Sequence, residues 1–201
     1  ANAIFGISPM GRADLELRGE KVERFTTHEM ISRGLIMTPE LRRLGMFRDY
    51  TLIDNIKMLF LERYTSMGFV RDKEADDFAF SVLKRNNVKY SSGQQRISEL
   101  SGGNIQKIII GRSIADENNA VIILDEPTNG LDLGAKHEVY LKARSLAEQD
   151  GKGVIFITSE IDEIFNVCDR AYVFAYGNIV QAFSRDEFDK QEILKAAFRE
   201  V

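Results

Sequence analysis

The chain has 201 residues, 44% of them hydrophobic and 29% charged, which suits one globular domain with room for a subdomain. Its 31 acidic residues outnumber its 27 basic ones. This balance argues against nucleic acid as a partner, because proteins that bind it usually carry a basic stripe. The lone cysteine, Cys168, excludes an intrachain disulfide, and no apolar run reaches the ~18–20 residues of a membrane-spanning helix. Any membrane association is therefore expected to be peripheral.

The first half of the chain is expected to mix short strands with helices. Residues 13–17 alternate apolar and polar side chains as a half-buried strand does, a short helix is expected over 27–34, and a short buried strand over 35–37. Between residues 46 and 88 the pattern becomes helical, and its second helix is expected over 72–84. We interpret this stretch as a helical insert in an α/β domain.

The second half alternates buried strands with helices. Residues 120–124 are uninterruptedly apolar, as in a parallel strand that is covered on both faces. A second buried strand is expected over 154–157. Helices are also expected over 135–148, 161–167 and 186–198, and a hairpin is expected over 171–183. This alternation predicts an α/β fold with a mostly parallel sheet and right-handed crossovers.

A Ser-Gly-Gly sequence, residues 101–103, opens an expected helix. A helix N-terminus offers unpaired backbone N–H groups and the positive end of the helix dipole, and glycines let an anion approach that backbone. The hydroxyl of Ser101 adds another donor, so the three residues together predict a phosphate-binding site. A plain helix cap made of serine and glycine is an equally good interpretation of these residues alone.

Two carboxylates, Asp125 and Glu126, follow the expected strand over 120–124. Ligands of open α/β sheets bind at the carboxyl ends of the strands. Asp125 suits Mg²⁺, which prefers oxygen ligands and retains waters, and Glu126 would then be free to polarise a water that attacks a phosphoanhydride. The alternative is that the two acids merely solvate a strand end before the turn at Pro127.

A third segment, Asp132 before the expected helix over 135–148, is by itself more simply a turn or helix-cap residue. In chain order, the three segments resemble the signature motif, the Walker B motif with its catalytic glutamate, and the D-loop of the ATP-binding-cassette (ABC) ATPases. The resemblance extends through almost the whole chain. It implies a P-loop NTPase-like α/β core with a helical subdomain, ATP and Mg²⁺ as cofactors, and ATP hydrolysis as the activity.

Finer features resemble one branch of that family, the ATPases of ribose, galactose or xylose importers, which carry two ABC halves in one polypeptide. The signature with Asn104 and Lys107 resembles that of these importer ATPases, and the D-loop over residues 130–136 resembles that of their C-terminal half. So does Ser159, which stands where the N-terminal half has a histidine. Glu40 stands in the Q-loop, where most ABC proteins have glutamine, and by resemblance joins the Mg²⁺ site.

The sequence departs from the family pattern in three ways. No Gly-x-x-x-x-Gly-Lys-[Ser/Thr] occurs, so we expect the P-loop strand and helix to precede this chain, with residues 1–6 as the tail of that helix. The carboxylate of Glu40 cannot donate a hydrogen bond to a phosphate oxygen. Ser159 can bond a γ-phosphate but brings no imidazole that could become cationic. The last two departures are typical of the C-terminal half and put hydrolysis at its own site in question.

Halves of this family pair head to tail, and each ATP lies between the P-loop of one half and the signature of the other. The resemblance therefore implies that the signature acts in trans on the ATP of the N-terminal half, through residues Ser101, Gly102, Gly103 and Gln106. The second ATP site would be served by Asp125, Glu126, Glu40 and Ser159, the catalytic roles falling to Glu126 and Ser159. Asp132 would act in the D-loop.

We therefore expect a truncated start of the core over 1–45, a helical subdomain over 46–100 and the rest of the core over 101–201. The expected function is ATP hydrolysis that energises import of a monosaccharide, at the cytoplasmic face of the cell membrane. Expected partners are the N-terminal half, the transmembrane permease and, indirectly, a sugar-binding protein. The alternatives are a nucleoside importer ATPase, or a soluble ABC-class ATPase that acts on ribosomes or DNA. A non-catalytic interaction module is disfavoured by Glu126 and the intact signature.

Overall fold

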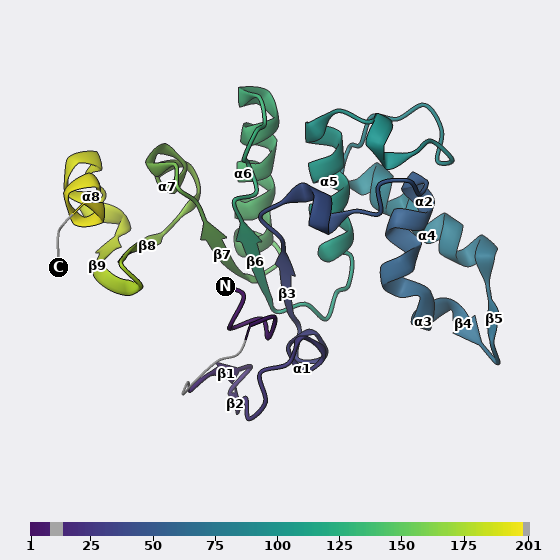
Figure 1. Ribbon diagram of the computed structural model, residues 1–201, viewed down its shortest axis with the longest axis horizontal. Coiled ribbons are helices and arrows are strands. Elements are labelled where there is room, and N and C mark those ends of the chain that lie inside the picture. Colours follow the sequence, from purple (N-terminus) through teal and green to yellow (C-terminus); the bar gives the residue numbers. More distant parts are fainter. Residues whose placement is uncertain (9–13, 199–201) are drawn as a thin grey trace.

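A computed structural model describes residues 1–8 and 14–198 of the chain. Its centre is a parallel sheet of three strands in the order β3 (Leu35–Thr38), β6 (Val121–Asp125) and β7 (Gly153–Ile157). Helices pack around this sheet, a helical unit lies on one side of it, and a separate hairpin lies on the other (Figure 1). The expected α/β fold with a parallel sheet and a helical subdomain is confirmed.

Strand β6 is buried on both faces, as its apolar run predicts. Ile122 and Leu124 point to a hydrophobic cluster that also contains Ile110 of α5 (Gly102–Ser113) and Val139 of α6 (Leu133–Glu148). Ile123 points the opposite way, into a cluster with Met30 of α1 (Thr27–Ser32). The side-chain period of two in a strand places alternate residues in the two clusters. Packing on both faces fixes the position of β6 and therefore the position of Asp125 at its carboxyl end.

Strand β7 departs from the expectation of a second buried strand. It pairs only with β6 in the described part of the chain, and Ile155 at its middle is 44% exposed. Val154 and Phe156 pack against the cluster of β6 and α6, but the opposite face is half open. An apolar run therefore predicts the strand but not whether a neighbour covers it.

The helical unit is built from α2 (Leu52–Lys57), α3 (Leu61–Tyr64) and α4 (Asp72–Arg85), and a short hairpin of β4 (Thr65–Ser66) and β5 (Phe69–Val70) joins the last two. A hydrophobic cluster unites α2 and α4 with Ile108 of α5. Helix α5 thus contributes to both the helical cluster and the core cluster of β6. The predicted domain boundary near residue 100 stays a prediction. Helix α5 packs against both units and so connects them.

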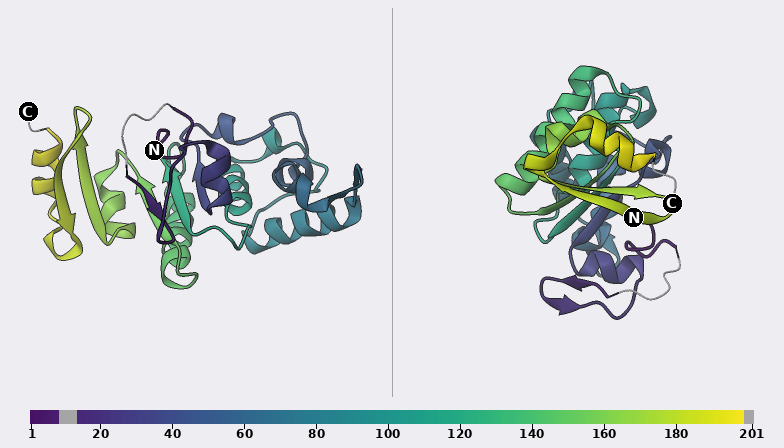
Figure 2. Two further views of the ribbon diagram at one scale, coloured as in Figure 1. Left: turned by 90° about the horizontal axis from the view of Figure 1, so that it is seen from below. Right: turned by 90° about the vertical axis from the view of Figure 1, so that its left-hand side faces the viewer.

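The C-terminal end of the described chain is a separate layer. Helix α7 (Ile161–Val167) leads into the hairpin of β8 (Arg170–Ala175) and β9 (Asn178–Ser184), and α8 (Lys190–Ala197) packs on that hairpin. The left view of Figure 2 shows this layer at one end of an elongated molecule and the helical unit at the other. The expected helix over 186–198 begins later, at Lys190, because Asp189 caps it.

The remaining elements are short. The first hairpin consists of β1 (Glu16–Leu17) and β2 (Glu20–Lys21). The described residues also contain four 3₁₀ turns, at Arg42–Gly45, Met58–Phe60, Ile97–Glu99 and Arg185–Glu187. No helix in the described residues combines the length and the apolarity needed to cross a bilayer.

Candidate functional site: the carboxyl edge of the sheet and the start of helix α5

The three parallel strands end at one edge of the sheet, and predicted site residues follow each of them. Thr38 pairs with Leu124, and Asp125 pairs with Ile157, so the carboxyl ends are in register. Glu40 lies two residues beyond β3, Asp125 is the last residue of β6, and Ser159 lies two residues beyond β7. The structure therefore brings the predicted acids and the serine to the edge at which α/β sheets bind ligands.

The carboxyl group of Asp125 lies within the electrostatic influence of Glu40. Partial burial raises the pKa of Asp125, and the negative charge of Glu40 raises it further. Mg²⁺ commonly binds through one or two carboxylates and keeps its waters, so this oxygen donor pair fits that ion. The described residues hold no cluster of three or more His, Cys, Asp or Glu side chains suited to a metal.

Glu126 has an unusual backbone conformation. Its φ of 44° lies in the left-handed region that non-glycine residues rarely adopt, and its N–H donates to the carbonyl of Ile157, 2.9 Å away. Such backbone strain clusters at functional sites and persists only where the surroundings hold it. The Glu126 carboxylate forms no hydrogen bond or ion pair with the described residues, and its expected role with a water stays a prediction. The sequence alone does not reveal this strain.

Glu163 of α7 is a buried carboxylate that sequence reasoning missed. It is 1% exposed and accepts hydrogen bonds from Thr128 (2.6 Å), Thr158 (2.6 Å) and the hydroxyl of Tyr140 (3.0 Å). The Lys136 ammonium lies 3.5 Å from it. Burial and the bond to Glu163 raise the pKa of Tyr140. This network fixes the segments that follow β6 and β7, next to Glu126 and Ser159.

Ser101 caps helix α5. Its hydroxyl oxygen accepts from the backbone N–H of Asn104 at 3.5 Å and from the Asn104 side-chain amide at 3.1 Å. Ser101 is exposed and Gly102 and Gly103 are half-buried, so a ligand can reach these residues. Gln106 is different, because it is 3% exposed and its Oε1 has no hydrogen-bond partner in the described part of the chain. That burial does not favour direct contact between Gln106 and a ligand on the exposed face.

Arg42 connects the segment after β3 to the other motifs, and sequence reasoning did not identify it. Its guanidinium donates to the carbonyls of Asn129 (3.1 Å) and Gly130 (3.4 Å), and it occupies the space that a Cβ at Gly102 would need. The glycine at 102 therefore gives the arginine room beside the helix start. Through this one side chain, the Q-loop segment, the signature and the loop before α6 are in contact.

Asp132 caps α6 by accepting from the backbone N–H of Ala135 at 2.9 Å. The cap interpretation is thus confirmed, and a D-loop role stays a prediction. Ser159 is exposed and makes no hydrogen bond with the described residues, and Thr158 beside it is held by Glu163.

A protein-family model described as ABC transporter matches residues 1–129, more than half of the chain. The chain is 36% identical over 198 residues to a ribose import ATP-binding protein of Rubrobacter xylanophilus, covering 98% of this chain and 38% of that protein. It is 35% identical over 198 residues to a galactose/methyl galactoside import ATP-binding protein of Vibrio vulnificus, covering 98% and 39%. The chain therefore spans well under half the length of these relatives.

Among solved structures, a dimeric ATP-binding cassette in a post-hydrolysis state with ADP and Pi matches with a TM-score of 0.75. That match covers 93% of this chain and 79% of the other at 20% sequence identity, so it supports the fold alone. The cassette fold and the family model agree with the expected fold class. The chain belongs to the ABC transporter family, within its ATP-binding cassette.

Proposed function

We propose that this chain is the C-terminal half of the ATPase subunit of a monosaccharide importer and works only together with a cassette half that carries a P-loop. The observation that carries the proposal is the convergence of Glu40, Asp125, Glu126 and Ser159 at one sheet edge, on the motif order of the family. The curated relatives named for ribose and galactose import support sugar as the cargo.

Two sites are expected in the assembled ATPase. The exposed cap at Ser101, with Gly102 and Gly103, suits an anion that approaches the first backbone N–H groups of the twelve-residue helix α5. We propose that this surface completes the ATP site of the other half. The carboxyl edge with Asp125 and Glu126 would hold the second ATP, against a P-loop supplied from outside the chain. When bound, Mg²⁺ would supply charge neutralisation at the phosphates, and Asp125 and Glu40 are the groups that would hold it.

The two sites are expected to contribute unequally. Ser159 cannot become cationic, and the Glu40 carboxylate repels phosphate oxygens, so the edge of this half is poorly equipped for hydrolysis. We therefore propose that the signature of this half serves the working site. Glu126 would then be dispensable for most of the turnover, although its strained backbone still shapes the second site.

The proposal is tested in a chimera in which this chain replaces the matching segment of the Rubrobacter xylanophilus relative. Ser101→Arg places a bulky cation at the helix start and is expected to abolish ATP turnover, whereas Glu126→Gln is expected to leave most of it. Lys195→Gln, an exposed change on α8, is the matched control. Turnover that survives Ser101→Arg and is lost with Glu126→Gln would reverse the assignment of the two sites.

A permease partner is proposed for the helical side. The segment between β3 and α2 exposes apolar side chains at Leu44 (71%), Phe47 and Tyr50, beside the Q-loop segment. Exposed apolar groups gathered beside a functional loop indicate a protein contact. Charge introduced by Leu44→Glu is expected to abolish co-purification of the chimera with the permease of that relative and to preserve ATP turnover. Retained co-purification would place the permease contact elsewhere.

A further inference from the structure

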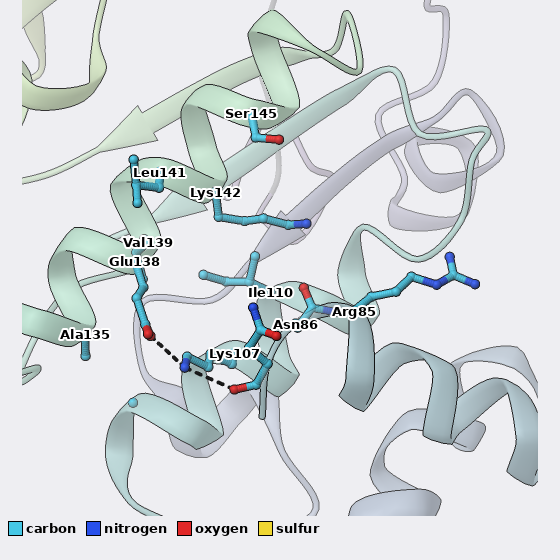
Figure 3. A pocket seen from close by; sticks show the side chains of 12 residues that line it. Arg85, Asn86, Lys107, Ile110, Ala135, Glu138, Val139, Leu141, Lys142 and Ser145 are labelled. Carbon is cyan, nitrogen blue, oxygen red and sulfur yellow. Dashed lines mark hydrogen bonds and ion pairs between the residues drawn. The ribbon is translucent and has the colours of Figure 1, made fainter. Parts of the chain in front are cut away.

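A cavity of about 280 Å³ lies between the C-terminal end of α4 and helices α5 and α6. It lies outside the carboxyl edge of the sheet, and of the predicted site residues only Gly103 lines it. Its wall is mainly aliphatic where Ile110, Val139 and Leu141 face it, and basic side chains reach it from all three helices (Figure 3).

Lys142 of α6 lines this cavity without an ion-pair partner among the described residues. Its side chain extends into the space between α6 and the end of α4 (Figure 3), and it forms neither a hydrogen bond nor an ion pair with any described residue. Burial lowers the pKa of Lys142, the charge of Arg85 acts in the same direction, and Asp150 opposes them without forming an ion pair. A partly desolvated ammonium without a partner is unfavourable.

A second lysine of the same cavity, Lys107, does have an ion-pair partner. Lys107 of α5 forms an ion pair with Glu138 at 2.6 Å and donates to the carbonyl of Asn87 at 3.2 Å, as the dashed lines in Figure 3 mark. Arg85 resembles Lys142 in this respect, because within residues 1–8 and 14–198 its guanidinium bonds only the Ser81 hydroxyl, at 3.3 Å. The cavity therefore carries two cations that form no ion pair with the described residues, beside an aliphatic wall.

We propose that this cavity binds a small organic anion, whose carboxylate or phosphate head pairs with Lys142 and whose apolar body packs against Ile110 and Val139. An ion pair that is partly shielded from water is stronger than an exposed one, and the aliphatic wall adds apolar burial.

Such a ligand would bridge the signature helix and the helix that follows the D-loop. Gly103 and Ala135 both line the cavity, and a Cβ at Gly103 would lie 3.1 Å from that of Ala135. An anion bound here would contact α4, α5 and α6 together and favour the arrangement in which they enclose it. The inference needs only the chain itself and does not depend on the proposed transport function.

The test uses the 201-residue chain with hexanoate and hexyl phosphate as probes, and hexanol and inorganic phosphate as comparators. Binding is followed by amide chemical shifts of Gly103 and Ala135 and by the shift in melting temperature. We expect at least one of the organic anions to bind more tightly than both comparators. Lys142→Gln should weaken its binding by about tenfold or more, because a charge-assisted pair is lost. Lys142→Arg should retain it.

Lys195→Gln on α8 removes the same charge far from the cavity and is expected to change nothing. Equal binding by hexanol would show that the charge of Lys142 does not select the ligand. If inorganic phosphate bound as tightly as the organic anions, the aliphatic wall would contribute nothing to the affinity. No binding to the wild-type chain at millimolar probe, or unchanged binding to a folded Lys142→Gln variant, would overturn the proposal.

Discussion

The hydroxyl of Thr128 donates a 2.6 Å hydrogen bond to the carboxylate of Glu163, and this bond joins the loop after β6 to helix α7. The other oxygen of the same carboxylate accepts from Thr158, at the end of β7. One buried side chain thus holds together the two loops that carry Glu126 and Ser159.

We predict that Glu163→Ala destabilises the chain by about 3–5 kcal/mol, because it leaves three hydroxyl donors and the Lys136 ammonium without their buried acceptor. Denaturant unfolding measures the change. Glu160→Gln removes an exposed carboxylate that also pairs with Lys136, and it should cost about 1 kcal/mol or less. Similar costs for the two variants would mean that the network is not a buried tie.

Gly34 provides a second test of the core. Its φ of 83° is left-handed, its carbonyl accepts from the N–H groups of Ala120 (2.7 Å) and Val121 (3.1 Å), and a Cβ would lie 2.5 Å from the carbonyl oxygen of Asn118. Gly34→Ala is therefore expected to lower the free energy of unfolding by about 2–4 kcal/mol.

The matched control is Gly19→Ala, whose φ is 79° but whose Cβ would meet nothing within 4 Å. It carries only the conformational cost of about 1–2 kcal/mol. Thermal melts of the two variants side by side separate the collision from the backbone strain. An equal loss in both would contradict the close approach of Gly34 to the loop before β6.

Asp132 allows its two interpretations to be separated. As the N-cap of α6, its replacement by alanine should cost about 1 kcal/mol of stability, and Asp132→Asn should retain most of the cap because asparagine also accepts the bond. If Asp132 also acts in the D-loop, Asp132→Asn should lower ATP turnover of the chimera without lowering its melting temperature. Full turnover with Asp132→Asn would leave the cap as its function.

Motifs and strongly periodic elements follow from the sequence, because they depend on neighbours in the chain. The continuous apolar run predicts β6, the 3.6-residue pattern predicts α4 (Asp72–Arg85), and the Ser-Gly-Gly triplet predicts the start of α5. Glu163 could not be predicted, since an acid in the first turn of a short helix is ordinarily a solvated residue. Its burial depends on Tyr140 and on Thr128, which is 35 positions away in the chain.

The exposed face of β7 is a second feature that the sequence alone does not predict. Val154, Phe156 and Ile157 suggest a buried strand, yet Ile155 between them is 44% exposed. Whether an apolar strand is covered depends on elements that are remote in the sequence. Arg42 likewise became recognisable only when its contacts to Asn129 and Gly130 were visible.

Cys168 reports on the layer formed by α7 and α8. Burial raises the pKa of its thiol, so a smaller fraction is thiolate at a given pH in the folded chain than in the unfolded chain. We predict that iodoacetamide at mildly alkaline pH alkylates the folded chain at least about tenfold more slowly than the urea-unfolded chain. Equal rates would show that the thiol is not shielded from solvent in the folded layer.

The central claim, that the chain supplies a signature and not a complete ATP site, is tested most directly by Mg-ATP hydrolysis. The measurement compares the chain alone with the chimera that restores the remaining segments of the Rubrobacter xylanophilus relative. The account predicts no turnover by the chain alone, because it has no Gly-x-x-x-x-Gly-Lys-[Ser/Thr] loop, and turnover by the chimera that Ser101→Arg abolishes. Steady turnover by the purified chain alone would contradict it.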